Sequence, residues 1–193
     1  MTASTTADLT PRQRRLVLAT VGLSLMAVVS AVAGLNVALP SLAVETGASQ
    51  TQLTWIVDSY TVVFAGLLLI AGALGDRYGR KLMLIIGLVI FGGGAAMGLF
   101  VTDPDQLIAV RMVMGVGAAA IMPTTLSVIT TSFPEEERGR AIGVWVGIAG
   151  GGAIIGLFVT ALLLEWFSWS SFFGLNVAFA TVGLIGAITV VPQ

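Results

Sequence analysis

Six long hydrophobic segments, separated by short polar ones, follow one another along the chain. Each is close to the roughly 20 apolar residues that cross a hydrocarbon layer about 30 Å thick. Their Leu, Ile, Val, Ala, Gly and Met residues do not alternate with polar ones, so the pattern predicts helices and not barrel strands. The spans are expected at Leu16–Leu39, Leu53–Leu74, Leu82–Val101, Leu107–Thr130, Ala141–Leu164 and Phe172–Val191.

This pattern predicts an all-α membrane protein, built as one six-transmembrane-helix bundle over residues 16–191. Residues 1–15 are expected to form a cytoplasmic N-terminal segment, and residues 192–193 the start of a cytoplasmic linker or a truncated end. Of the 193 residues, 56% are hydrophobic and only 10% are charged, against about 25% charged in an ordinary soluble domain. An ordinary water-soluble enzyme is therefore excluded, and the lipid bilayer is the first expected partner.

The residue types that are missing narrow the chemistry further. The chain has no cysteine and no histidine, which removes disulfides, thiolate nucleophiles, imidazole bases and nearly every transition-metal site. We therefore expect no metal, no cofactor and no catalytic residue. The net charge of −1 provides no basic field for nucleic acid.

Positive charge is confined to alternate loops. The loops on one side of the predicted membrane hold eight of the nine cations: Arg12, Arg14, Arg15, Arg77, Arg80, Lys81, Arg138 and Arg140. The loops on the other side hold only acidic charges, among them Glu45, Asp103 and Asp105. Because cytoplasmic loops carry the excess of Lys and Arg, both termini are expected in the cytoplasm.

The loop between the second and third spans has an ordered pattern. Its defined positions are Gly72, Asp76, Arg77, Gly79, Arg80 and Lys81. Glycines permit a tight reversal here, and the plainest interpretation is a solvated turn. The order Gly-x-x-x-Asp-Arg-x-Gly-Arg-Lys, however, resembles the hallmark cytoplasmic loop of the major facilitator superfamily at every defined position.

Other segments resemble the 14-span drug:proton antiporter branch of that family, which includes quaternary-ammonium and multidrug exporters. They are Trp55-Ile-Val-Asp-Ser-Tyr60, Arg111-Met-Val-Met-Gly-Val-Gly117, Ile121-Met-Pro123-Thr-Thr-Leu126 and Phe167-Ser-Trp169. The similarity covers almost the whole chain but only the first six spans of the family, which implies one half of the fold with three-plus-three inverted repeats. It implies an exporter in the bacterial inner (plasma) membrane, driven by proton entry, with its substrate cavity between two six-span halves.

Two charged residues lie within the spans, Asp58 in the second and Arg111 in the fourth. An unpaired charge in lipid costs roughly 2.5 kcal/mol or more, so we expect the two to share one polar site between these spans. Asp58 can exchange a proton and is the expected proton carrier, whereas Arg111 stays charged and organises the site. The alternative is a static ion pair, or an Asp58 hydrated from outside.

The same spans supply candidates for the substrate cavity. Trp55 and Tyr60 offer aromatic faces that would attract an organic cation. Asn36 and Pro123, in segments that resemble the family, complete the set.

Glycines recur on the fifth span at intervals of four. Gly143, Gly147 and Gly151 form one stripe, and Gly152 and Gly156 form an adjoining one. Small residues at this spacing let neighbouring helices approach closely. We therefore expect helix packing along two stripes; a sliding surface against the other half of a transporter is the functional alternative.

The expected function is proton-coupled export of small amphiphilic or cationic compounds, with the substrate, protons and a second six-span half as partners. Three alternatives stay open. Ala31 stands where the family usually has an acidic residue, which fits a facilitator without proton coupling. The chain would otherwise be a half-transporter that pairs with itself or another half, or, given its stop at Gln193, a truncated fragment.

Overall fold

The computed structural model describes residues 9–192, which form an all-helical bundle. Its helices are α1 (Pro11–Thr46), α2 (Gln50–Tyr78), α3 (Arg80–Gly98), α4 (Pro104–Ser132), α5 (Glu135–Trp166) and α6 (Ser171–Thr189). All of them are long and apolar enough to cross a membrane. The predicted all-α, six-helix fold is confirmed, and the expectations for residues 1–8 and Gln193 lie outside the described residues.

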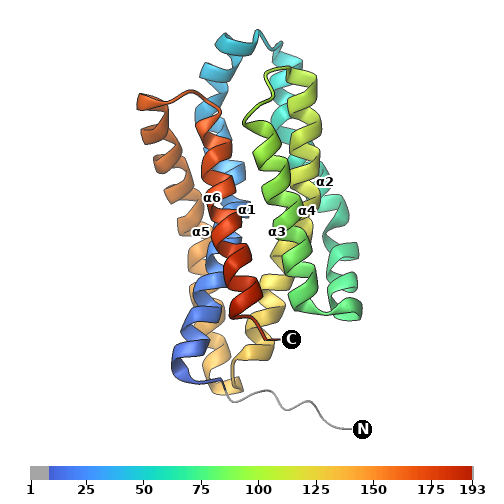
Figure 1. Ribbon diagram of the computed structural model, residues 1–193, viewed down its shortest axis with the longest axis vertical. Coiled ribbons are helices and arrows are strands. Elements are labelled where there is room, and N and C mark those ends of the chain that lie inside the picture. Colours follow the sequence, from blue (N-terminus) through green and yellow to red (C-terminus); the bar gives the residue numbers. More distant parts are fainter. Residues whose placement is uncertain (1–8, 193) are drawn as a thin grey trace.

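The helices run alternately up and down, so both termini lie at the same end of the bundle (Figure 1). We call this the basic end, because it carries Arg12, Arg14 and Arg15 and the α2–α3 and α4–α5 junctions with their cations. In the bundle α1 contacts α4, and α3 contacts α6. The helices α2 and α5 lie on opposite flanks, where α2 packs on α4 and α5 packs on α1.

The first helix begins earlier than the expected span. The Thr10 hydroxyl caps the helix by accepting a hydrogen bond from the Gln13 backbone N–H at 3.3 Å. The Gln13 side-chain oxygen in turn accepts one from the Thr10 backbone N–H at 2.9 Å. Pro11 occupies the first helical position, where its missing N–H and fixed φ are favourable. Residues 11–15, expected in a separate segment, are therefore helical, and their arginines extend the helix beyond the apolar span.

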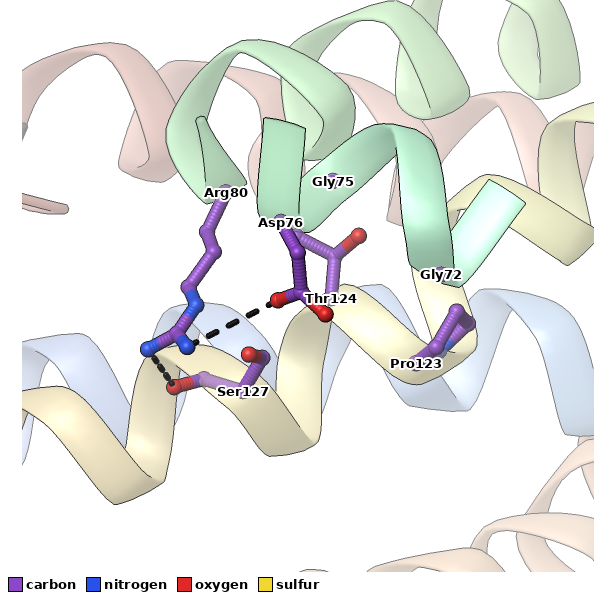
Figure 2. A pocket seen from close by; sticks show the side chains of 7 residues that line it. All are labelled: Gly72, Gly75, Asp76, Arg80, Pro123, Thr124 and Ser127. Carbon is purple, nitrogen blue, oxygen red and sulfur yellow. Dashed lines mark hydrogen bonds and ion pairs between the residues drawn. The ribbon is translucent and has the colours of Figure 1, made fainter. Parts of the chain in front are cut away.

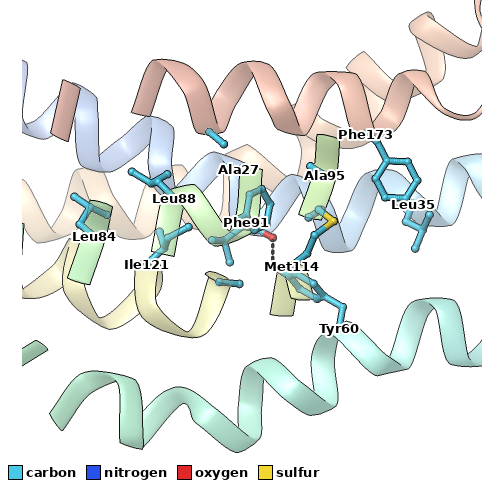
Figure 3. Close-up of a cluster of buried hydrophobic side chains, with 14 of the residues drawn as sticks. Ala27, Leu35, Tyr60, Leu84, Leu88, Phe91, Ala95, Met114, Ile121 and Phe173 are labelled. Carbon is cyan, nitrogen blue, oxygen red and sulfur yellow. Dashed lines mark hydrogen bonds between the residues drawn. The ribbon is translucent and has the colours of Figure 1, made fainter. Parts of the chain in front are cut away.

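The backbones of α3 and α4 approach each other closely in the interior of the bundle. Figure 3 shows Leu84, Leu88 and Phe91 of α3 beside Ile121 of α4. A Cβ atom added at Gly117 of α4 would lie 2.5 Å from the Phe91 amide nitrogen. Lipid tails are as apolar as these side chains, so close van der Waals packing, which glycine permits, holds the helices together.

Candidate functional site

A charged residue is buried between helices in the half of the bundle opposite the basic end. Arg111 of α4 is only 1% exposed, and its Nε donates a hydrogen bond to the Ile56 carbonyl oxygen of α2 at 3.0 Å. Its guanidinium carbon lies 4.3 Å from the centre of the Tyr60 ring, in a cation–π contact. The Tyr60 hydroxyl in turn donates to the Val28 carbonyl oxygen of α1 at 3.0 Å. These contacts connect α4, α2 and α1.

The expected pairing of Asp58 with Arg111 is wrong. Asp58 is exposed, and within residues 9–192 the ion pairs are Arg14–Glu137 and Arg80–Asp76. Asp58 lies two residues from both Ile56 and Tyr60, which is about 200° around a helix of 3.6 residues per turn. Its side chain therefore points away from α4.

Asp58 instead lines a cavity between α1 and α2 near the end opposite the basic end. The cavity has a volume of about 430 Å³. Its walls are mostly apolar, with Leu39 and Pro40 of α1 facing Leu53 and Val57 of α2. The arrangement places one carboxylate beside an apolar surface, which suits a ligand that combines positive charge with hydrophobic groups.

The other residues proposed for a substrate cavity are not brought together. Trp55 is 49% exposed, and Asn36 is exposed with its amide donating to the Val32 carbonyl oxygen of its own helix at 3.0 Å. Tyr60 is fully buried, so its assignment to an open cavity is wrong. Pro123 lies beside the α2–α3 turn, lining the small cavity there.

That turn forms a second polar cluster, at the basic end. Figure 2 shows the Arg80 side chain reaching the Ser127 carbonyl oxygen of α4, at 3.2 Å, and the Asp76 carboxylate, at 3.7 Å. A cavity of about 80 Å³ lies between the turn and α4. Asp76 keeps 71% of its side chain exposed, so its carboxylate is available for a further partner.

A glycine and a lysine fix the shape of the turn. Gly79 adopts φ = 102°, a conformation that side chains disfavour. A Cβ at Gly75 would lie 3.6 Å from the Thr124 hydroxyl, an ordinary contact, so an alanine would also fit between α2 and α4 here. Lys81 donates to the Ile188 carbonyl oxygen near the end of α6 at 3.0 Å. The turn is thus attached to both α4 and α6.

The two glycine stripes of α5 have different surroundings. A Cβ at Gly156 would lie 2.5 Å from Ser30 Cβ of α1, and one at Gly152 would lie 3.0 Å from Val29. At Gly143, Gly147 and Gly151 nothing among the described residues lies within 4 Å of such an atom. One stripe therefore packs against α1 as expected, while no helix within residues 9–192 lies against the other.

Sequence reasoning missed a third cluster, where α1 and α5 begin. Arg14 and Glu137 form an ion pair of 3.1 Å across the two helices. A cavity of about 370 Å³ lies beside them and is also lined by Arg15 and Arg140. No local signal could have found it, because the pairing of α1 with α5 is a tertiary feature.

The fold and the α2–α3 turn together define a transporter-type membrane bundle. The chain belongs to the major facilitator superfamily, whose family model matches residues 5–193. The membership predicted from the hallmark turn is confirmed, and the chain is a multi-pass membrane protein of this family.

Several of the relatives are named as drug-resistance proteins, and another is named as the riboflavin transporter RibZ of Clostridioides difficile. The chain is 43% identical over 149 residues to the methyl viologen resistance protein SmvA of Salmonella typhimurium, which covers 77% of this chain and 30% of that protein. It is 39% identical over 152 residues to the puromycin resistance protein pur8 of Streptomyces alboniger, covering 78% of this chain and 30% of the relative. The chain thus matches about a third of these relatives' length.

A solved structure has the same arrangement of helices. It is a bacterial homologue of the human lysosomal transporter Spinster, in an inward-facing and unoccupied conformation. The TM-score is 0.71 at 18% identity, and the match covers 94% of this chain and 43% of the other. At this identity the likeness supports the fold alone, as one part of a longer transporter.

Proposed function

We propose that this chain forms one half of a proton-coupled exporter of small amphiphilic or cationic compounds. The observation that carries the proposal is the exposed Asp58 carboxylate on the 430 Å³ apolar cavity between α1 and α2. A hydrophobic cation and a proton would compete for this one carboxylate. Such competition couples export of the first to entry of the second.

Arg111 has a positioning role in this proposal. Its hydrogen bond to Ile56 and its contact with Tyr60 hold α2 against α4. Asp58 lies on the opposite side of the same segment of α2, so its place in the cavity depends on these buried contacts. Arg111 does not bind the transported ion.

The test is the variant Asp58→Asn in proteoliposomes that hold the chain together with its second half. We expect loss of transport driven by a pH gradient, with unchanged helicity, because Asp58 is exposed and makes no ion pair among residues 9–192. The matched control is Glu45→Gln, which neutralises another exposed carboxylate at the same end. Transport by Asp58→Asn at the wild-type rate and with the same pH dependence would remove Asp58 from the mechanism.

A facilitator without proton coupling is the second candidate, favoured by the buried Ala31 of α1, which offers no carboxylate. It would move substrate down its own gradient at a rate that does not respond to an imposed pH difference. The same proteoliposomes decide between the two mechanisms.

The second half is itself part of the proposal. The stripe of Gly143, Gly147 and Gly151 lacks a partner helix among the described residues, and Asp76 is largely exposed. Both would be covered by another six-span half or by a second copy of this chain. Gly147→Leu should leave this chain folded but weaken its association with the other half, measured by co-purification. Unchanged association would exclude this stripe from the contact.

We also propose that the chain lies in the inner membrane with both termini in the cytoplasm. The chain contains no cysteine, so single cysteines at positions 45, 78, 104 and 137 give labels without background. Positions 45 and 104 should react with an impermeant reagent in intact cells, and positions 78 and 137 should not. Labelling of position 78 from outside would show that the chain has the opposite orientation.

A further inference from the structure

The cavity at the start of α1 and α5 combines a concentrated positive charge with a defined volume. It measures about 370 Å³, and its polar lining consists of Arg14, Arg15, Arg140 and Glu137. Three arginines and one glutamate therefore line it, and the lining carries an excess of two positive charges. No other cavity described above has more than one cation in its lining.

The hydrogen-bonding capacity of these arginines is not used up within the described part of the chain. Arg14 pairs with Glu137 through one terminal nitrogen, but its Nε is shielded from solvent and has no hydrogen-bond partner among residues 9–192. Neither Arg15 nor Arg140 takes part in an ion pair there. Buried donors normally have a partner, and an acceptor that binds in this cavity beside Arg14 could supply one.

The deeper wall of the cavity is apolar. Leu18 lies four residues after Arg14 on α1, and Val144 lies four residues after Arg140 on α5. At 1.5 Å per residue, each is about 6 Å further from the helix start and towards the bundle's middle. A ligand bound here would place its anionic group at the arginines and its apolar part against the leucine and valine.

We propose that this cavity binds the phosphodiester headgroup of an anionic phospholipid. Planar guanidinium groups match phosphate oxygens with paired hydrogen bonds. Basic pockets between transmembrane helices also suit lipid headgroups, because the depth of the charge coincides with that of the bilayer surface. The bound lipid would bridge α1 and α5 and stabilise their contact. This site requires no proton coupling and lies at the opposite end from Asp58.

The experiment measures lipid bound to the purified chain in uncharged detergent by native mass spectrometry. The probes are phosphatidylglycerol and phosphatidylcholine at equal concentration, and we expect a clear preference for the first. Arg15→Gln and Arg140→Gln should each lower that preference about fivefold, the equivalent of about 1 kcal/mol per basic residue near the membrane surface. Arg12→Gln is the matched control, because Arg12 is exposed on the same helix and does not line the cavity.

Two results would overturn the proposal. Equal losses in Arg12→Gln and Arg15→Gln would mean that lipid responds to diffuse surface charge and not to the cavity. Displacement of phosphatidylglycerol by an equal concentration of inorganic phosphate would mean that the site holds a free anion. Arg15→Lys should retain part of the preference, and thermal unfolding of each variant in phosphatidylcholine shows whether its fold is intact.

Discussion

One of the two closest helix contacts described above gives a quantitative prediction for Gly156→Ala. A Cβ at this position would lie 2.5 Å from Ser30 Cβ and 2.7 Å from Ser30 Cα. To reach ordinary contact the distance must grow from 2.5 to 3.4 Å, so α1 and α5 must separate locally by about 0.9 Å. No rotamer change of Ser30 relieves this overlap, because its Cα and Cβ atoms are fixed by the backbone.

The expected cost follows from two opposing terms. Forcing an extra carbon into a packed interior costs about 1–3 kcal/mol. Replacing glycine by alanine in a helix stabilises it by about 1 kcal/mol. Gly156→Ala should therefore lower the free energy of unfolding by about 0–2 kcal/mol, whereas Gly147→Ala, which meets nothing within 4 Å, should leave it unchanged or raise it.

The assay is unfolding in mixed micelles at increasing mole fraction of sodium dodecyl sulfate, followed by tryptophan fluorescence and far-ultraviolet circular dichroism. The two variants should differ by about 1–3 kcal/mol, since they share the gain in helix propensity and differ only in the overlap. Equal stability of the two would refute the close packing of α5 on α1.

Three further variants test single contacts. Tyr60→Phe removes the hydrogen bond to Val28 and should cost about 0.5–1.5 kcal/mol in the same unfolding assay; no loss would mean that the bond is not formed in the membrane. Gly79→Ala places a side chain at φ = 102° and should cost about 1 kcal/mol or more, while Gly93→Ala, with open space around it, should not. Asp103→Ala removes the cap that accepts from the Asp105 and Gln106 amides and should cost about 0.5–2 kcal/mol, with less helicity at the start of α4 by hydrogen exchange.

Hydropathy alone located the helices, because a segment must be apolar over about 20 residues to lie in lipid and must be helical there to satisfy its backbone hydrogen bonds. The hallmark turn was also recognisable, since its glycine and charge positions follow one another in sequence. Gly79 indeed adopts a positive φ, and Arg80 and Lys81 bind carbonyl oxygens of neighbouring helices. Residues close together in the sequence were sufficient to predict the helices and this turn.

The site in the spans was harder to predict. Asp58 and Arg111 lie at similar depth, and opposite charges in lipid favour a pair. The pair fails because the direction of a side chain around its helix depends on which neighbour the helix packs against. Tyr60 and Ile56 face α4, so Asp58, two residues away from each, faces elsewhere. Depth along a span does not determine this rotation.

The glycines of α5 illustrate the same limit. Their spacing predicted two packing stripes, but only the stripe of Gly152 and Gly156 lies against α1. The cavity between Arg14 and Arg140 was invisible for a related reason, because these residues are far apart in sequence and meet only through the pairing of α1 with α5. Both the packing of the glycine stripes and the formation of this cavity depend on which helices are neighbours in the folded bundle.

The packing of α1 also affects how the protein is made. This helix packs mainly against α5 and α6 and has fewer contacts with α2, its neighbour in sequence. Its buried Ser30 donates to Asn176 at 3.3 Å, across 146 residues. A ribosome that adds about 5–20 residues per second needs roughly 7–30 seconds to synthesise that partner. The first helix therefore enters the membrane well before α5 and α6, which cover it, and during a translational stall its serine faces lipid, insertase or protease.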